Sequence, residues 1–178
     1  MTISPLDKLI ALAALDIGGI KAAPGSAAWQ RAMETALVKA HTAAGMVGIA
    51  QRTGVDPRGL SKAERADIKR AVGEQLPYLR RFAAQAGDMT PDAVATRAAL
   101  YASAIKATYY EQRWGTWEIP DNLMPTKQAC MVQCKCEISV ADNGDGTGTL
   151  TRTMRGVENH CTECPPLAGD HDVKRRAA

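Results

Sequence analysis

The sequence predicts a mainly α-helical protein, with a helical body of about four helices followed by a small C-terminal zinc-binding β-hairpin. Hydrophobic residues make up 46% of the 178 residues but aromatic residues only 4%, and Phe82 is the single phenylalanine. Much of the apolar content is alanine, which loses no side-chain entropy in a helix and suits close-packed helices. All five cysteines lie in two late clusters, "CMVQCKC" (130–136) and "HCTEC" (160–164). These observations divide the chain into a helical domain (1–112) and a cysteine-rich end.

Residues suited to helix N-termini precede each of the four predicted helices. Serine and threonine side chains accept hydrogen bonds from the first free backbone amides, and proline fits the first helical position. A serine followed three residues later by glutamate forms a capping box. The predicted starts are Ser4-Pro5, Ser26, Ser61 with Glu64, and Thr90-Pro91.

Apolar residues recur at intervals of three and four in the last two predicted helices, which indicates one buried stripe on each. Gly18-Gly19 ends the first helix, whereas Gly45 and Gly48 either fray the second or permit close contact. Pro77 removes a backbone donor, so we expect a kink or a break near Gln75. The stripes comprise Ile68, Val72, Leu76 and Leu79 in the third helix, and Val94, Ala98, Tyr101, Ile105 and Tyr109 in the fourth.

Residues 113–126 differ in composition from the helical domain and predict a connecting arm. The segment "RWGTWEIPDNLMP" holds two tryptophans, a glycine and two prolines. Trp114 and Trp117 either anchor this arm on the helices or form an interface with another chain, since tryptophan is enriched at binding hot spots.

Residues 127–170 form the predicted cysteine-rich zinc hairpin. Ile138, Val140 and Leu150 alternate with polar residues on either side of "DNGDG", which predicts two strands and a turn. That turn lacks the spacing and the distal glutamate of a calcium loop. Residues 171–178 predict a flexible tail, in which Lys174, Arg175 and Arg176 are free to contact an acidic partner.

The hairpin would return the chain to its start and bring the two cysteine clusters together. Four thiolates at that point would form a closed tetrahedral zinc site, and the metal would stabilise a segment too small to bury a core. A tetrahedral site takes four ligands, so one of the five thiols has to be left out. Cys130 is the first to omit, although a site that keeps Cys130 is nearly as plausible, and His160 or His171 can replace a thiol. The metal ligands are therefore four of Cys130, Cys134, Cys136, Cys161 and Cys164.

Three interpretations of the thiols remain open: structural zinc, two disulfides formed outside a reducing cell, and reactive thiols. The N-terminus lacks the pattern of a signal peptide, which favours synthesis in a reducing cytoplasm and hence zinc. A catalytic zinc would need an open position and a general base. Glu137, Glu158 and Glu163 are near in sequence, but acidic side chains on a small hairpin are usually just solvated.

Composition and motifs indicate that the chain is not an enzyme. The chain shows no nucleophile elbow, no phosphate-binding glycine loop and no paired catalytic carboxylates. His41, in the second predicted helix, is expected to be an exposed or packing residue. The net charge of +3 permits nucleic-acid contact without favouring it. No apolar run reaches the roughly 20 residues that cross a bilayer, so no membrane association is expected.

Several stretches resemble the head-morphogenesis proteins of Mu-type tailed phages. They are "GEQLPYLRRFAAQAG" (73–87), "TRAALYASAIKATYYEQRWGTWE" (96–118) and "CMVQCKC", which resembles the family's C-terminal motif with an N-C-R-C core. Gln133 and Lys135 replace the asparagine and arginine of that core. "HCTEC" resembles a second cysteine pair found in some members. The resemblance covers roughly residues 60 to 165.

The resemblance implies a structural component of a tailed-phage virion, a minor head or head–tail connection protein that acts in assembly. It implies capsid, portal or neck proteins as partners, multiple copies per particle, and a host-cytoplasmic stage before assembly. Members of the family are often longer and carry a further mixed α/β region. The alternative function is a zinc-containing nucleic-acid-binding protein whose phosphate contacts would come from Lys127, Lys135, Arg152, Arg155 and the basic tail.

Overall fold

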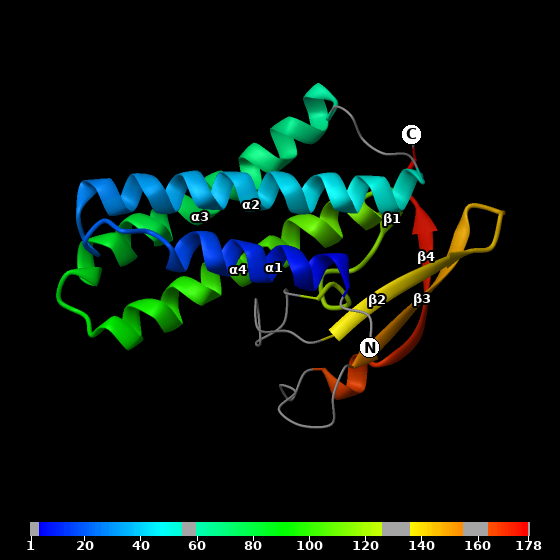
Figure 1. Ribbon diagram of the computed structural model, residues 1–178. Coiled ribbons are helices and arrows are strands. Elements are labelled where there is room, and N and C mark those ends of the chain that lie inside the picture. Colours follow the sequence, from blue (N-terminus) through cyan, green and yellow to red (C-terminus); the bar gives the residue numbers. More distant parts are fainter. Residues whose placement is uncertain (1–3, 55–59, 126–135, 155–163, 178) are drawn as a thin grey trace. The chain divides into compact units, whose positions relative to one another are not determined.

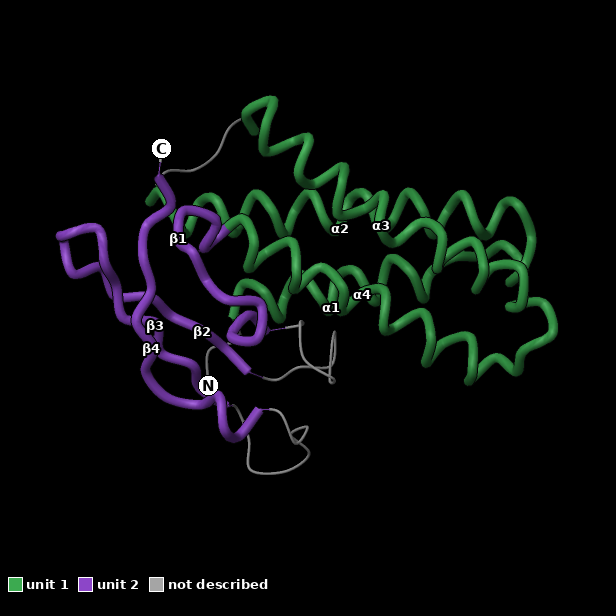
Figure 2. Tube along the Cα trace, turned by 180° about the vertical axis from the view of Figure 1, so that it is seen from behind, with its two compact units in different colours: residues 1–112 green, residues 113–178 purple. Residues whose placement is uncertain are grey.

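The computed structural model describes residues 4–54, 60–125, 136–154 and 164–177. The chain divides into two compact units, Met1–Gln112 and Arg113–Ala178 (Figures 1 and 2). The first unit is helical, and the second contains a small sheet. The expected fold class, mainly helical with four helices and a small β region after them, is confirmed.

Unit 1 consists of four helices, and each begins where the sequence predicts. They are α1 (Pro5–Gly18), α2 (Ala27–Thr53), α3 (Lys62–Ala86) and α4 (Pro91–Trp114), whose last two residues belong to unit 2. The backbone amide of Asp7 donates to the Ser4 hydroxyl, that of Trp29 to Ser26 and that of Ala93 to Thr90. Ser61 and Glu64 form both bonds of the predicted capping box.

Of the two alternatives near Gln75, a kink or a break, the break is wrong, because α3 continues through Pro77 to Ala86. A proline inside a helix costs about 3 kcal/mol through its missing donor and its clash with the preceding turn. On either side of Pro77 the same helical face is buried, with Val72 before it and Leu79 and Phe82 after it. Burial of that face, at roughly 1.5–3 kcal/mol for each large apolar side chain, offsets the local cost.

An aromatic cluster from three helices lies in the core of unit 1. The ring of Phe82 in α3 lies edge-on to Trp29 of α2, with centroids 5.3 Å apart, and stacks on Tyr101 of α4 at 5.7 Å. Around it, the side chains of Met33, Leu37, Leu79 and Ile105 are fully buried. The single phenylalanine of the chain therefore joins α2, α3 and α4.

Small residues let the helices of unit 1 approach closely. Gly45 is buried in α2, and a Cβ added there would lie 2.6 Å from Cδ1 of Ile68 in α3. Of the two alternatives for Gly45 and Gly48, close contact therefore holds for Gly45. The helix does not fray, since it continues to Thr53, where Gly54 ends it in the left-handed conformation.

Unit 2 contains a four-stranded antiparallel sheet in the order β1-β4-β3-β2 (Figure 2). The strands are β1 (Trp117–Glu118), β2 (Cys136–Asp142), β3 (Thr147–Met154) and β4 (Gly169–Arg175), and a short 3-10 helix, Pro165–Leu167, precedes β4. The predicted hairpin is β2–β3, with Val140 opposite Leu150. In its turn, Gly144 and Gly146 have positive φ, and the side chains of Asp142 and Asp145 accept backbone amide hydrogens.

Two expectations about the ends of unit 2 are corrected. Residues 171–178 were expected to form a flexible tail, but residues 171–175 belong to β4. This strand holds one buried apolar residue, Val173, and is stabilised by backbone pairing on both sides, with β1 and with β3. The arm expected over 113–126 likewise contributes β1 to the sheet. The hairpin β2–β3, which lies within the segment 127–170 predicted to bind zinc, is therefore part of a larger sheet.

Trp117 explains why β3 carries a glycine at a buried position. Its ring lies so close to Gly148 that an added Cβ would be 2.8 Å from two ring carbons and 2.9 Å from the Ala141 carbonyl oxygen. The guanidinium of Arg175 covers the ring at 5.0 Å from its centroid. Trp117 thus packs against β3 and β4 of its own unit.

We expect Gly148→Ala to destabilise the sheet by roughly 1–3 kcal/mol, because the new methyl group overpacks against the indole and the Ala141 carbonyl. Hydrogen exchange over residues 136–154 would report faster amide exchange. Gly73→Ala is the control, since an added Cβ at Gly73 in α3 meets open space. It should stabilise the helix by about 0.5–1 kcal/mol. Unchanged exchange in the Gly148 variant would contradict the packing argument.

Candidate functional site

Two of the predicted metal ligands lie together in unit 2. Cys136 at the start of β2 and Cys164 just before the 3-10 helix are 3% and 1% exposed and share one buried cluster, against which Met154 packs. In the sheet register, Cys136 lies opposite Met154. The expectation that the hairpin brings the two cysteine regions together therefore holds for this pair.

A buried arginine lies beside Cys164. Arg152, in β3, is 1% exposed. Its Nη2 donates to the Cys164 sulfur at 3.4 Å, and its Nη1 donates to the backbone carbonyl oxygen of Asn122 at 2.8 Å. This position was not expected, since under the alternative function Arg152 was a surface residue able to contact phosphates. The alternation of side chains along a strand could have indicated it, because Arg152 lies on the same face of β3 as the buried Gly148 and Leu150.

The other predicted ligands are only partly within the described residues. Cys130, Cys134, Cys161 and His160 lie outside them. His171 lies in β4 opposite Leu150, and its Nε2 donates to the Leu167 carbonyl oxygen at 3.0 Å. Within the described ranges no three potential metal ligands come together. The pair of buried sulfurs, one of them accepting a bond from a cation, nevertheless fits the chemistry of thiolate ligands.

The acidic residues near the cysteines give little basis for catalysis. Glu158 and Glu163 lie outside the described residues, and Glu137 lies half-buried in β2 opposite Thr153. The carboxylates of the hairpin turn are exposed, and local bonds hold their pKa values low. For Asp142 the bonds come from the Gly144 amide and Arg175, and for Asp145 from Thr147. These two groups are therefore engaged in shaping the turn.

The two tryptophans predicted to anchor the arm or form an interface, Trp114 and Trp117, lie in different environments. Trp117 is 6% exposed and packs inside the sheet of its own unit, whereas the two alternatives were anchoring on the helices and an interface with another chain. Trp114 is half-buried at the end of α4, with the Arg113 guanidinium 4.6 Å from the centroid of its ring. Its Nε1 is buried and has no hydrogen-bond partner among the described residues.

The basic residues expected to contact phosphates under the alternative function differ in exposure and in the bonds they already form. Arg152 is buried and cannot reach a nucleic-acid backbone. Arg175 forms an ion pair with Asp142, and Nε of Arg176 donates to the Trp117 carbonyl. Lys174 is exposed on β4, whereas Lys127, Lys135 and Arg155 lie outside the described residues. The alternative function therefore loses one of its named contacts.

His41 is a packing residue, one of the two alternatives in the sequence analysis. It is 1% exposed in α2, and its Nδ1 lies 2.7 Å from the Thr108 hydroxyl of α4. Its Nε2 is buried without a hydrogen-bond partner among the described residues. Burial lowers the pKa of His41 to about 4, because the charged imidazolium would lose its hydration. At neutral pH the ring is therefore uncharged.

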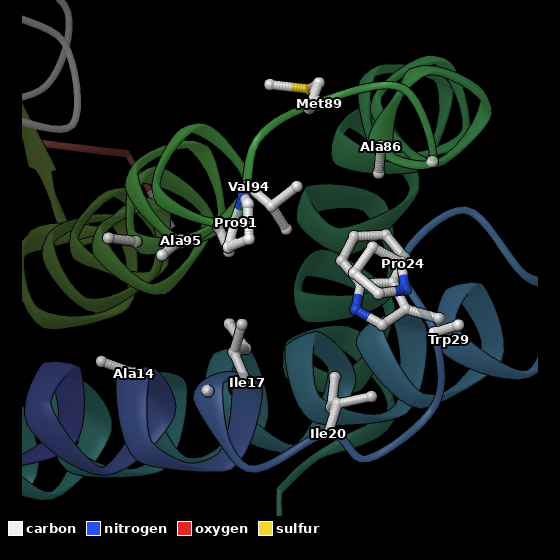
Figure 3. A pocket seen from close by; sticks show the side chains of 15 residues that line it. Ala14, Ile17, Ile20, Pro24, Trp29, Ala86, Met89, Pro91, Val94 and Ala95 are labelled. Carbon is white, nitrogen blue, oxygen red and sulfur yellow. The ribbon is translucent and has the colours of Figure 1, made fainter.

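Unit 1 also contains an apolar cavity of about 670 Å³ (Figure 3). It lies among α1, the segment before α2, the end of α3 and the start of α4. Ile17 and Val94 face one another across it. The described residues that line it are all glycine or apolar, so they offer contact area without a group for acid–base or metal chemistry.

No family model, no curated protein and no solved structure matches the chain. In the described part of the chain, none of the helices combines the length and apolar character needed to cross a bilayer. Any function proposed for the chain therefore rests on its own residues, among them the two buried sulfurs and the arginine beside them.

We expect the helical body to lose stability in acid through His41. Above pH 6.5 the ring is neutral in both states. As the pH falls from 6.5 to about 4, the unfolded chain takes up a proton that the folded chain does not, so the free energy of unfolding falls. At pH 5 the loss is on the order of 2 kcal/mol. Urea unfolding followed by helical circular dichroism at several pH values measures it.

His41→Gln removes this titration, so its unfolding free energy should depend less on pH over the same interval, whatever its absolute stability. His171→Gln is the matched control and should retain the wild-type dependence. Equal pH dependence for wild type and His41→Gln would show that the buried ring is not responsible.

Proposed function

We propose that the chain is a structural component of a tailed-phage virion, a minor head or head–tail connection protein that acts in particle assembly. The observation that carries the proposal is the burial of Cys136 and Cys164 in one cluster at the base of the sheet. It agrees with the C-terminal cysteine motif that "CMVQCKC" and "HCTEC" resemble. The stretches 73–87 and 96–118, which share the resemblance, form parts of α3, α4 and β1.

The cysteine cluster is suited to a structural zinc ion. Cys136 and Cys164 would supply two of four sulfur ligands, with the others among Cys130, Cys134 and Cys161. Unit 2 has few large buried apolar side chains among its described residues, including Trp117, Leu123, Ile138, Leu150 and Val173. A bound metal would add the stability that such a small core lacks. Its role would be to fix shape, in keeping with an assembly part.

The partners implied are other virion proteins, namely capsid, portal or neck proteins, with several copies of this chain per particle. The packing of Trp117 would make unit 2 rigid, because this side chain holds β1 against β3 and β4. A nucleic-acid-binding role remains the second hypothesis, and its basic groups at β4 include the exposed Lys174. Duplex DNA binding at low salt that weakens steeply as salt rises would favour it.

We expect the purified chain to contain about one zinc per molecule, measured by elemental mass spectrometry after gel filtration. Removal with a chelator should unfold the sheet, seen as rapid hydrogen exchange over 136–154 and 164–177, because metal binding and folding of a small unit are coupled. Cys136→Ser and Cys164→Ser should lose the metal. Ser139→Ala, an exposed change on the same strand, is the control. A metal-free chain with an intact sheet would exclude structural zinc.

The assembly role predicts that the chain copurifies with particles. Particles assembled from the genome that encodes it, purified on a density gradient, should contain the chain and yield cross-links to head or neck proteins by mass spectrometry. Cys164→Ser should lower its incorporation, while Ser139→Ala should not. Absence of the wild-type chain from both precursor and mature particles would overturn the proposed function.

A further inference from the structure

The cavity of unit 1 has walls from all four helices and from the connections that follow α1 and α3 (Figure 3). Its volume of about 670 Å³ lies within the range of small-molecule pockets, which is roughly 300–1,000 Å³. An engineered apolar cavity of about 150 Å³ is already large enough to bind benzene. The cavity can therefore surround a hydrophobic molecule larger than benzene on several sides.

A close backbone contact fixes one end of the cavity. Gly25, in the connection between α1 and α2, lies so near Gly87 that an added Cβ would be 2.8 Å from the Gly87 nitrogen. Gly87 directly follows α3 and is one of the residues that line the cavity. The two glycines let the connections pack backbone against backbone, so this wall is held in place.

The other walls combine exposed small side chains with buried larger ones. Ala14 of α1 and Ala95 of α4 are exposed, so the cavity is accessible from solvent between these helices. The side chains of Ile17 and Val94 are buried and face one another across the space (Figure 3). A ligand can thus enter past methyl groups and bury its surface against branched apolar side chains.

Trp29 supplies the one N–H or O–H donor among the described side chains that line the cavity. This side chain is 4% exposed, and its ring packs edge-on against Phe82, which holds its orientation. Figure 3 shows the nitrogen-bearing edge of the indole turned toward the cavity. The backbone amide of Trp29 donates to Ser26, but its indole Nε1 has no hydrogen-bond partner among the described residues. A buried indole N–H usually has one.

We infer that this cavity binds a neutral hydrophobic molecule with one hydrogen-bond acceptor, such as a ketone or an ester, whose oxygen accepts from Nε1 of Trp29. Burial of the apolar part of the ligand supplies most of the affinity. The acceptor adds orientation, because it pairs a donor that otherwise lies in apolar surroundings. A charged ligand is disfavoured, since no lining side chain can compensate a buried charge.

This inference is independent of the proposed function. The cavity lies within unit 1, and none of its lining residues is a cysteine or belongs to the sheet.

The test titrates the full chain with two neutral probes of nearly the same shape, acetylnaphthalene and isopropenylnaphthalene, substituted at the same ring position. The first has a carbonyl oxygen where the second has a methylene group. Calorimetry should show that the ketone binds roughly 2- to 10-fold more tightly, the contribution of one net hydrogen bond. Naphthoate, the charged analogue, should not bind. In NMR spectra of ¹⁵N-labelled chain, the ketone should move the Trp29 indole proton further downfield than the hydrocarbon does.

Variants separate the donor from the cavity. Trp29→Phe removes the donor but keeps an aromatic ring, so it should bind both neutral probes equally, and its spectrum assigns the Trp29 indole signal. Ala95→Phe fills the entrance and should abolish binding of both. Thr96→Phe is the matched control, because Thr96 is exposed on the same helix and does not line the cavity. It should bind both probes as wild type does. If Trp29→Phe does not fold, the two probes on wild type decide.

Each outcome bears on a defined part of the inference. Folded wild-type chain that binds neither neutral probe overturns the ligand site. Equal wild-type affinity for the two probes overturns the role of the indole donor and the choice of ligand class. A wild-type dimer in gel filtration that Ala95→Phe dissociates shows a second copy in the cavity and overturns a small-molecule ligand. Preference for the ketone that is lost in Trp29→Phe supports the inference. None of these results changes zinc content or incorporation into particles, so failure here leaves the proposed function standing.

Discussion

The contact between a buried guanidinium and a buried sulfur is the constraint on which the second unit depends. Arg152 is held in β3 by pairing on both sides, and its two Nη atoms reach Cys164 and Asn122. A cation at 1% exposure in so small a sheet is tolerated only where neighbouring groups compensate its charge. The Asn122 carbonyl oxygen and the Cys164 sulfur are two such groups.

The helical unit reaches its stability in a different way. Its core is built from one aromatic cluster, Trp29, Phe82 and Tyr101, surrounded by aliphatic side chains and many alanines. Small residues such as Gly45 bring helices near enough for Ile68 to fill the space between them. His41 and Thr108 add a polar contact between α2 and α4. A body of this kind offers shape and surface, which is the property that an assembly component requires.

Local features of the fold were predictable from the sequence, whereas most non-local ones were not. Helix starts at Ser4, Ser26 and Ser61 could be located because a cap and its amide lie within three residues of each other. A break at Pro77 does not occur, because burial of Val72 and Phe82, which depends on tertiary packing, outweighs the local cost of the proline. In the candidate site, the meeting of Cys136 and Cys164 followed from a hairpin that returns to its start.

Strand β4 and the role of Arg152 depended on pairing between distant segments, which leaves little trace in sequence. The segment "GDHDVKR" has one apolar residue, Val173, at its buried position, so its hydrophobic alternation is too weak to indicate a strand. Arg152 looked like a surface cation because buried arginines are rare. Only the register of β3 between its two neighbours shows that its side chain points inward.

The strand order has a consequence for how the protein acquires its form during synthesis. Because β4 lies between β1 and β3, the last of the four described strands in sequence order occupies an inner position, and among the described residues β1 joins the sheet through it. Trp117 must find Arg175 across almost sixty residues of chain, and such distant pairing is a slow event. On the ribosome, helices with local contacts can form early, whereas the described sheet is complete only after β4 has followed β1, β2 and β3. A nascent chain stopped before residue 169 would leave two strand edges open to a neighbour.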